Sequence, residues 1–439
     1  MKKLLTTFFC SDKSQAPELL LSALFFVYLG IYFLIPYKPW TSPISFHTPF
    51  LLLGLAALGL RALLQKFPLA AIFSEEIPFF LLMAAFFLIS ALFIHSDKFS
   101  IGSFQAYTVS FLCFIFVRFT ARHINLELLY AWINIYLIAS AILILLQVNF
   151  AGIFYVSGHF GHYGFGLTSQ GWGFSNWSTL GGGIMAWFLT VATARYSFPS
   201  EIKKTGFSEA AYLCAIGLGT VGLFYTVCRS AWVGYIMASG CVLIVLHLAK
   251  CSKRNFSRAV LASMLFMAVF AVFLTPEVCG KKDKLNFFAQ FVSAPKSAVT
   301  HDASVNTRAQ TWGLALDAIK NSPVWGIGLD QFPVLYRQAY PQLIKASSGM
   351  IDLNRDIDPH NSYLYYAVEL GLLPAFFLFL LIARILFSGI RNGIVSEAYP
   401  FLMGIIAVCF WVFTNDFMEQ RIFWIVLALG AGLPALKRR

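Results

Sequence analysis

About twelve apolar segments, each near the length of one bilayer crossing, recur along this chain and constrain its fold more than any other feature. An α-helix rises about 1.5 Å per residue, so about 20 apolar residues span the hydrocarbon core of a membrane. The composition agrees, because 59% of the residues are hydrophobic and only 12% are charged, against about 25% charged in soluble domains. We therefore predict an all-α, polytopic integral membrane protein. The predicted spans are Leu19–Ile35, Pro49–Leu64, Ile77–Ile94, Ile101–Val117, Leu128–Val148, Thr179–Ala194, Ala210–Val227, Ala231–Leu248, Ala259–Leu274, Ser362–Phe387, Tyr399–Phe413 and Ile422–Leu436.

Lysine and arginine in the short loops predict the orientation of these spans. With the N-terminus in the cytoplasm, 19 of the 32 Lys and Arg residues fall in inside loops or termini, and 4 fall in short outside loops. This asymmetry predicts that both termini are cytoplasmic. The net charge of +12 then reflects membrane orientation and contact with anionic membrane lipids, so we expect no nucleic-acid partner.

The spans divide the chain into three regions. Residues 1–275 form an N-terminal transmembrane bundle of about nine helices, and residues 362–439 form the C-terminal transmembrane helices. Between them, residues 276–361 form an outside loop that is too long for a simple connection, and we expect it to carry amphipathic helices.

The clearest helical pattern in the long loop is TRAQTWGLALDAIKNSPVWGIG. Trp312, Leu316 and Ile319 recur at helical spacing on one face, and Asn321-Ser-Pro ends the pattern. This predicts an amphipathic helix that lies on the membrane surface or caps the bundle. Residues 324–328 are then a tight glycine turn.

A second outside loop, Asn149–Ser178, has no Lys or Arg but is rich in glycine, histidine and aromatic residues. Aromatic rings stack on sugar faces and glycine lets the chain approach closely, so His162 and Trp172 are candidate substrate contacts. The alternative is an interfacial loop that packs against neighbouring helices. His159 and His162 have no companion ligands at metal-binding spacing, and the eight cysteines are scattered, so we predict neither a metal nor a cofactor.

The motif DPHNSYLYYAVELG places His360 where the long loop re-enters the membrane. Asp358 or Asn361 can fix the imidazole tautomer, which leaves the other ring nitrogen to accept a proton. Asn361 is also a good N-cap for the following helix, and the alternative is that the motif is only a helix start. Asn361, Trp312 and Tyr363 are the neighbouring candidates for substrate binding.

Two arginines on the same predicted side can bind an anion. Arg229 lies between two apolar runs, and Arg308 opens the loop helix after the capping pair Asn306-Thr307. A planar guanidinium binds phosphate oxygens through two hydrogen bonds, and a helix N-terminus adds positive potential. The alternatives are an interfacial arginine that sets topology and a solvated loop arginine. Nothing in the sequence brings Arg229 and His360 together in space.

One more polar segment, TNDFMEQR, lies on the same predicted side. Asp416 and Glu419 there could orient Arg421 or an active-site arginine, although an ordinary polar hairpin is the simpler interpretation.

Two segments together resemble the shared region of the bacterial O-antigen ligase and O-antigen polymerase superfamily. They are NTRAQTWGLALDAIKNSPVWGIGLDQF and DPHNSYLYYAVELGLLPAFF. The residues that carry the resemblance are Arg308, Trp312, Pro323, Gly326, Gly328, His360, Asn361, Glu369 and Gly371. Upstream, CRSAW is similar to an "SRG" element of the family with Arg229 as its arginine, although Cys228 and Ala231 depart from that pattern.

The resemblance implies a glycosyltransferase of GT-C type in the bacterial inner membrane, with its active site on the periplasmic side. Its donor would be a glycan on undecaprenyl diphosphate, and its acceptor a sugar hydroxyl of lipid A–core. We predict that His360 acts as general base and that Arg229 and Arg308 stabilise the departing diphosphate, without a metal and with inversion.

Three other functions remain open at this stage. A polymerase would join lipid-linked repeats by the same chemistry, and some relatives transfer glycans to protein. A transporter for the lipid-linked glycan would need charged residues deep in the spans, which are nearly free of charge here. A single dominant external loop favours the ligase over the polymerase.

Overall fold

The computed structural model describes residues 16–34, 47–64, 76–98, 100–149, 178–197, 209–226, 228–273, 303–339, 358–391, 399–415 and 420–433. Every regular element in these ranges is a helix. The longer helices are α2 (Ala16–Leu34), α3 (His47–Leu64), α5 (Ile77–Ile89), α6 (Ile101–Thr120), α7 (Leu126–Asn149), α8 (Ser178–Tyr196), α10 (Glu209–Tyr225), α11 (Arg229–Leu248), α12 (Lys253–Phe273), α16 (Ala303–Asn321), α17 (Gln331–Ala339), α19 (Ser362–Leu370), α20 (Leu372–Arg391), α21 (Tyr399–Val412) and α22 (Arg421–Gly432). A π-helical turn, Ser90–Ile94, extends α5, and short 3-10 turns cover Ser96–Lys98 and Ala121–His123.

These helices confirm the all-helical prediction within the described residues and are consistent with a membrane protein. Six of them are long and apolar enough to cross a bilayer, and five shorter apolar helices accompany them among the described residues. Large apolar side chains such as Phe93, Leu248 and Phe379 are exposed, which suits contact with lipid tails. The count of twelve spans and the GT-C type remain predictions.

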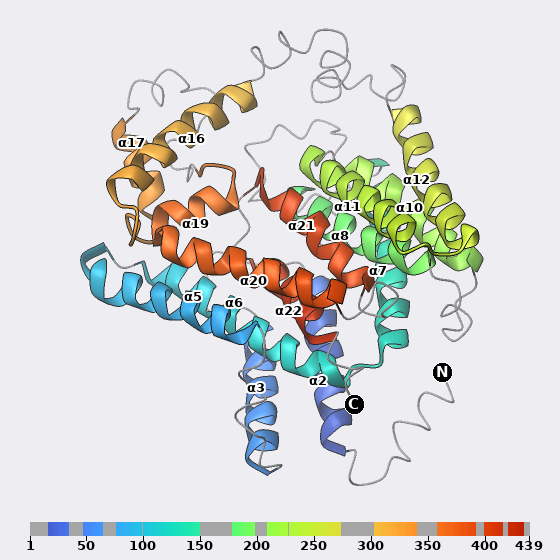
Figure 1. Cartoon of the computed structure of the whole chain (residues 1–439), viewed down its shortest axis with the longest axis horizontal. Helices are drawn as coiled ribbons and strands as arrows, with labels where there is room; N and C mark the ends of the chain where they lie inside the picture. Colours follow the sequence, from blue (N-terminus) through green and yellow to red (C-terminus); the bar gives the residue numbers. More distant parts are fainter. Residues whose placement is uncertain are drawn as a thin grey trace.

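Two C-terminal helices, α21 and α22, form the centre of the bundle (Figure 1). α21 packs against α8 and α11, and α22 packs against α6. Nearly every residue of α22 is buried, and the Trp424 ring meets the rings of Phe80, Phe111 and Phe114. The C-terminal region is therefore an integral part of the bundle that surrounds it.

Ion pairs join helix ends that the predicted topology places on the cytoplasmic side of the membrane. Each pair joins an arginine near a helix end to a glutamate from a neighbouring segment, and all three arginines are buried. Removal of one partner would leave a buried charge without compensation, which is strongly destabilising. The pairs are Glu76–Arg118, Glu127–Arg195 and Glu209–Arg258.

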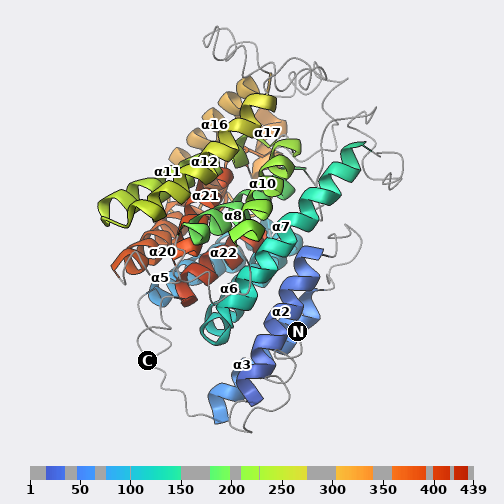
Figure 2. The ribbon, with the colours of Figure 1, turned by 90° about the vertical axis from the view of Figure 1, so that its right-hand side faces the viewer.

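The two helices of the long loop, α16 and α17, lie beside α19 and away from α2 and α3 (Figures 1 and 2). Ala315 and Ala318 of α16, Phe332 of α17, and Tyr365 and Val368 of α19 form a small separate core. This packing favours the expectation that the loop helix caps the bundle.

Two details of the sequence prediction are wrong. The predicted span Ser362–Phe387 is two helices, because Gly371 adopts a φ of +94° and ends α19. The buried face of α16 is Thr311, Ala315 and Ala318, whereas Leu316 is exposed. The small side chains of that face let α16 approach α19 closely, while Trp312 and Ile319 are half buried beside it.

Candidate functional site

His360 lies directly before α19 with its imidazole half exposed. Its Nδ1 is 3.0 Å from Asp358 Oδ1, and its backbone N–H donates to the same oxygen at 2.6 Å. In the neutral ring with its proton on Nδ1, Nδ1 donates to the carboxylate and Nε2 keeps a free lone pair. The carboxylate therefore orients the ring so that a base faces outward.

The backbone of His360 has a φ of +49°, in the left-handed region. Non-glycine residues adopt this conformation seldom, and it is found preferentially at functional turns. The side chain is exposed, so burial of the ring does not explain the conformation. It leaves the imidazole exposed just before the start of α19.

Asn361 fixes the start of α19, as predicted. Its side-chain Oδ1 accepts from the backbone N–H groups of Tyr363 and Leu364, both at 3.1 Å. Asn361 is buried, and the Tyr363 hydroxyl donates to the Cys409 carbonyl of α21 at 3.2 Å. Both side chains thus hold the His360 segment on the bundle, and their contact with substrate stays a prediction.

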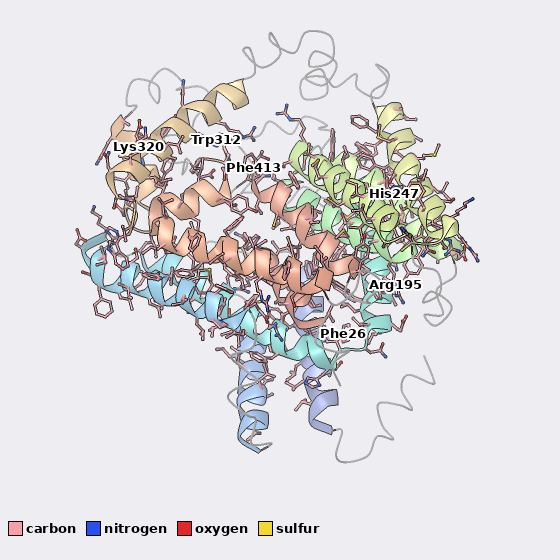
Figure 3. The ribbon with its side chains drawn as sticks, in the orientation of Figure 1. Phe26, Arg195, His247, Trp312, Lys320 and Phe413 are labelled. Carbon is pink, nitrogen blue, oxygen red and sulfur yellow. The ribbon has the colours of Figure 1, made fainter. Side chains whose placement is uncertain are left out.

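Trp312 joins α16 to the residue before His360. Its Nε1 donates to the Pro359 carbonyl at 2.7 Å, and its ring meets that of Phe413 edge-on at 5.8 Å (Figure 3). Arg308 lies four residues earlier in α16, hence on the same helix face. The side chain of Arg308 therefore emerges on the side of α16 that faces the His360 segment.

The prediction that Arg308 opens its helix is wrong. α16 begins at Ala303, so Arg308 lies in its second turn and the pair Asn306-Thr307 lies inside the helix. The helix N-terminus is too far away to add its potential directly, since that effect falls off within the first turn. Arg229, in contrast, is the first residue of α11 and has Cys228 as N-cap.

The structure brings Arg229 and His360 into one region. Ser230, next to Arg229, accepts a hydrogen bond from Asn415 Nδ2 at 2.6 Å. The Asn415 carbonyl in turn accepts from the N–H and Oγ of Ser362, at 2.9 and 2.6 Å. One residue thus links the start of α11 to the start of α19. Asn415 is the second residue of TNDFMEQR, but nothing in that segment marks it as a link between helices.

Several predicted residues lie outside the described residues. These are His162, Trp172, Asp416 and Glu419. Within the described ranges, no three His, Cys, Asp or Glu residues gather closely enough to hold a metal ion.

The Pro-x-x-Gly-x-Gly turn and the Glu-x-Gly helix end bind each other. The N–H groups of Ile327 and Gly328 donate to the carbonyls of Val368 and Glu369, at 2.9 and 3.0 Å, and Leu372 N–H donates to Pro323 at 2.7 Å. The break at Gly371 exposes carbonyls that a continuous helix would satisfy, and the turn supplies the missing donors. We call this contact the clasp.

The clasp is also anchored on the bundle. The Trp325 carbonyl accepts from Ser90 Oγ at 3.0 Å and lies 3.2 Å from His95 Nε2. The Asp330 carboxylate accepts from the hydroxyls of Ser100 and Ser103 at the start of α6. The clasp therefore fixes α16, and with it Arg308 and Trp312, relative to the transmembrane helices.

Gly371→Ala should open the clasp. A Cβ there would lie 2.0 Å from the Val324 carbonyl oxygen, on a backbone whose φ of +94° already disfavours a side chain. We expect a loss of about 2 kcal/mol or more of stability and a large loss of activity. Thermal unfolding of the purified protein measures the first. Gly313→Ala in α16 is the control, since its Cβ would meet open space. Equal unfolding midpoints for the two variants would contradict the clasp.

One comparison with known proteins is informative about this site. Residues 214–379 match a family model described as O-antigen ligase. The match runs from α10 into α20 and contains Arg229, Arg308, the clasp and His360. No curated protein matches the chain. The family model therefore confirms, over residues 214–379, the resemblance to the O-antigen ligase superfamily that the motifs indicated.

Proposed function

We propose that this protein transfers a glycan from undecaprenyl diphosphate to a sugar hydroxyl of lipid A–core at the periplasmic face of the inner membrane. The family domain supports a lipid-linked glycan transferase in O-antigen biosynthesis. One observation carries the proposal. The exposed imidazole of His360, which Asp358 orients, is linked through Asn415 to the start of the helix that begins at Arg229.

The reaction would be a direct displacement at the anomeric carbon. The acceptor oxygen forms a bond to that carbon as the bond to the diphosphate oxygen breaks, which inverts the configuration. His360 Nε2 takes the hydroxyl proton. Arg229 and Arg308 bind the diphosphate and stabilise the negative charge that develops on it as it leaves.

Arg229 is suited to the diphosphate because it combines two positive features. It is the first residue of α11, where the helix dipole favours an anion. Its side chain is half buried, so solvent screens its charge less than that of an exposed arginine. Arg308 adds a second guanidinium from α16.

Chelation of divalent metals should leave the transfer rate unchanged, because arginines would neutralise the diphosphate in place of Mg²⁺. The measurement is transfer by the purified protein with and without EDTA. Loss of transfer in EDTA, with recovery when Mg²⁺ is added, would contradict the role assigned to the arginines.

The acceptor is tested by reconstitution. Purified protein is mixed with undecaprenyl-diphosphate oligosaccharide and rough lipopolysaccharide, and the products are separated on a gel. A single shift of the lipopolysaccharide is the expected result. A ladder of longer lipid-linked glycans with unchanged lipopolysaccharide would overturn the ligase assignment in favour of a polymerase.

A further inference from the structure

Asn415 lies just after α21, outside the residues that match the family model. It is buried, and apart from a 3.5 Å contact with the neighbouring Thr414 its described polar contacts join it to helix ends. Its side-chain amide donates to Ser230 Oγ at 2.6 Å and to the Trp411 carbonyl at 2.7 Å. Its backbone carbonyl accepts both bonds from Ser362. Asn415 therefore connects α11, α19 and α21.

The connection continues on the α11 side. Ser230 Oγ lies 3.4 Å from Cys228 Sγ, and the Cys228 sulfur lies 3.7 Å from the Thr179 carbonyl at the start of α8. The Arg229 backbone is thus held between two residues that both have polar partners. On the other side, Ser362 is two residues from His360. The bonds therefore link the residue after Arg229 to the residue two positions after His360.

We propose that Asn415 is a positioning residue that fixes Arg229 relative to His360. The inference rests on the proposed function, in which the base and the arginine act on opposite sides of one anomeric carbon. Their separation must then match the length of the reacting group. A misplacement of about 1 Å can cost about 100-fold in rate, so a fixed link between the two helices has catalytic value.

The alternative is that Asn415 only ends α21 and stabilises the fold. Its amide bond to Trp411 within the same helix end fits that view. The bond to Ser230, 185 residues away in sequence, does not fit that view, because this bond contributes nothing to the end of α21 itself. If Asn415 is a positioning residue, removal of the Ser230 hydroxyl should loosen the start of α19. If Asn415 only ends α21, the start of α19 should be unaffected.

The kinetic test compares Asn415→Ala, Ser230→Ala and the double variant in reconstituted transfer. We expect each single variant to lower kcat about 10- to 100-fold with little change in the KM for the donor. The double variant should be no slower than the slower single variant, since both single variants remove the same Asn415–Ser230 bond. Asn134→Ala is the matched control, because Asn134 is a buried asparagine of α7 that donates to the Tyr130 carbonyl. It should keep its kcat.

A second measurement does not depend on activity. Hydrogen exchange of the Ser362 amide, which donates to Asn415, should become faster in Ser230→Ala as well as in Asn415→Ala. Ser230→Ala keeps the test available if Asn415→Ala does not fold. Unchanged exchange in Ser230→Ala, or additive effects on kcat, would overturn the positioning role. Absence of transfer by the wild-type protein would instead overturn the proposed function.

Discussion

Replacement of His360 by alanine should lower the rate of glycan transfer by about 10²- to 10⁴-fold, the range of a general base. The variant should fold normally, because the imidazole is half exposed and its only described side-chain contact is with Asp358. Its loss removes the proton acceptor at the acceptor hydroxyl and leaves the diphosphate site in place. The measurement is the rate of lipopolysaccharide modification by the purified variant, with donor binding determined separately.

Two further variants sharpen this test. Asp358→Asn should slow transfer less than His360→Ala, because it weakens the orientation of the ring without removing it. His247→Ala is the control, since His247 is an exposed histidine in the last turn of α11, at the end opposite Arg229. A His360→Ala enzyme with nearly normal transfer would remove the assignment of the base.

Replacement of Arg229 by alanine should lower kcat/KM for the donor by about 10²- to 10³-fold, the effect of removing one stabilising group from a developing anion. Arg229→Lys should recover part of this loss, because an ammonium keeps the charge but not the planar pair of donors. The measurement is the steady-state rate at varied donor concentration. The partial recovery separates a diphosphate contact from an arginine that only sets membrane topology.

The control for Arg229 is Arg254→Ala. Arg254 is exposed near the start of α12, where it pairs with Glu209 at 3.2 Å, among the helix ends opposite the site. Its removal should leave the transfer rate unchanged, since exposed ion pairs contribute little. Normal activity of Arg229→Ala, with the protein correctly inserted, would contradict the role of Arg229 in the diphosphate site.

Most of the helical architecture could be predicted from the sequence, because long apolar runs in a membrane must be helical to satisfy their backbone. The break at Gly371 could not. It lies within a continuous apolar run, and the donors that satisfy its carbonyls come from a turn more than 40 residues earlier, between Pro323 and Gly328. The motif that marks the family over this stretch is thus explained in part by backbone pairing.

Part of the candidate site could likewise be predicted from the sequence, and part could not. The His360 motif and the Asn361 cap follow from local rules, since a capping residue and its targets are neighbours in sequence. The face of α16 that is buried does not follow from local rules. The contact of α16 with α19 selects Thr311, Ala315 and Ala318 as the buried residues. The link from Arg229 to His360 depends on Asn415, which is 185 residues from Ser230 and 53 from Ser362. Only the folded chain brings these three segments together.

The most direct test of the central claim measures release of undecaprenyl diphosphate by the purified protein in lipid nanodiscs, with and without acceptor. We predict that one undecaprenyl diphosphate is released for each glycan transferred, only when acceptor is present, and that His360→Ala and Arg229→Ala both abolish most of this release. If the donor stays intact and no undecaprenyl diphosphate is released when donor and acceptor are both present, the result would contradict a transferase. It would instead support transport of the lipid-linked glycan.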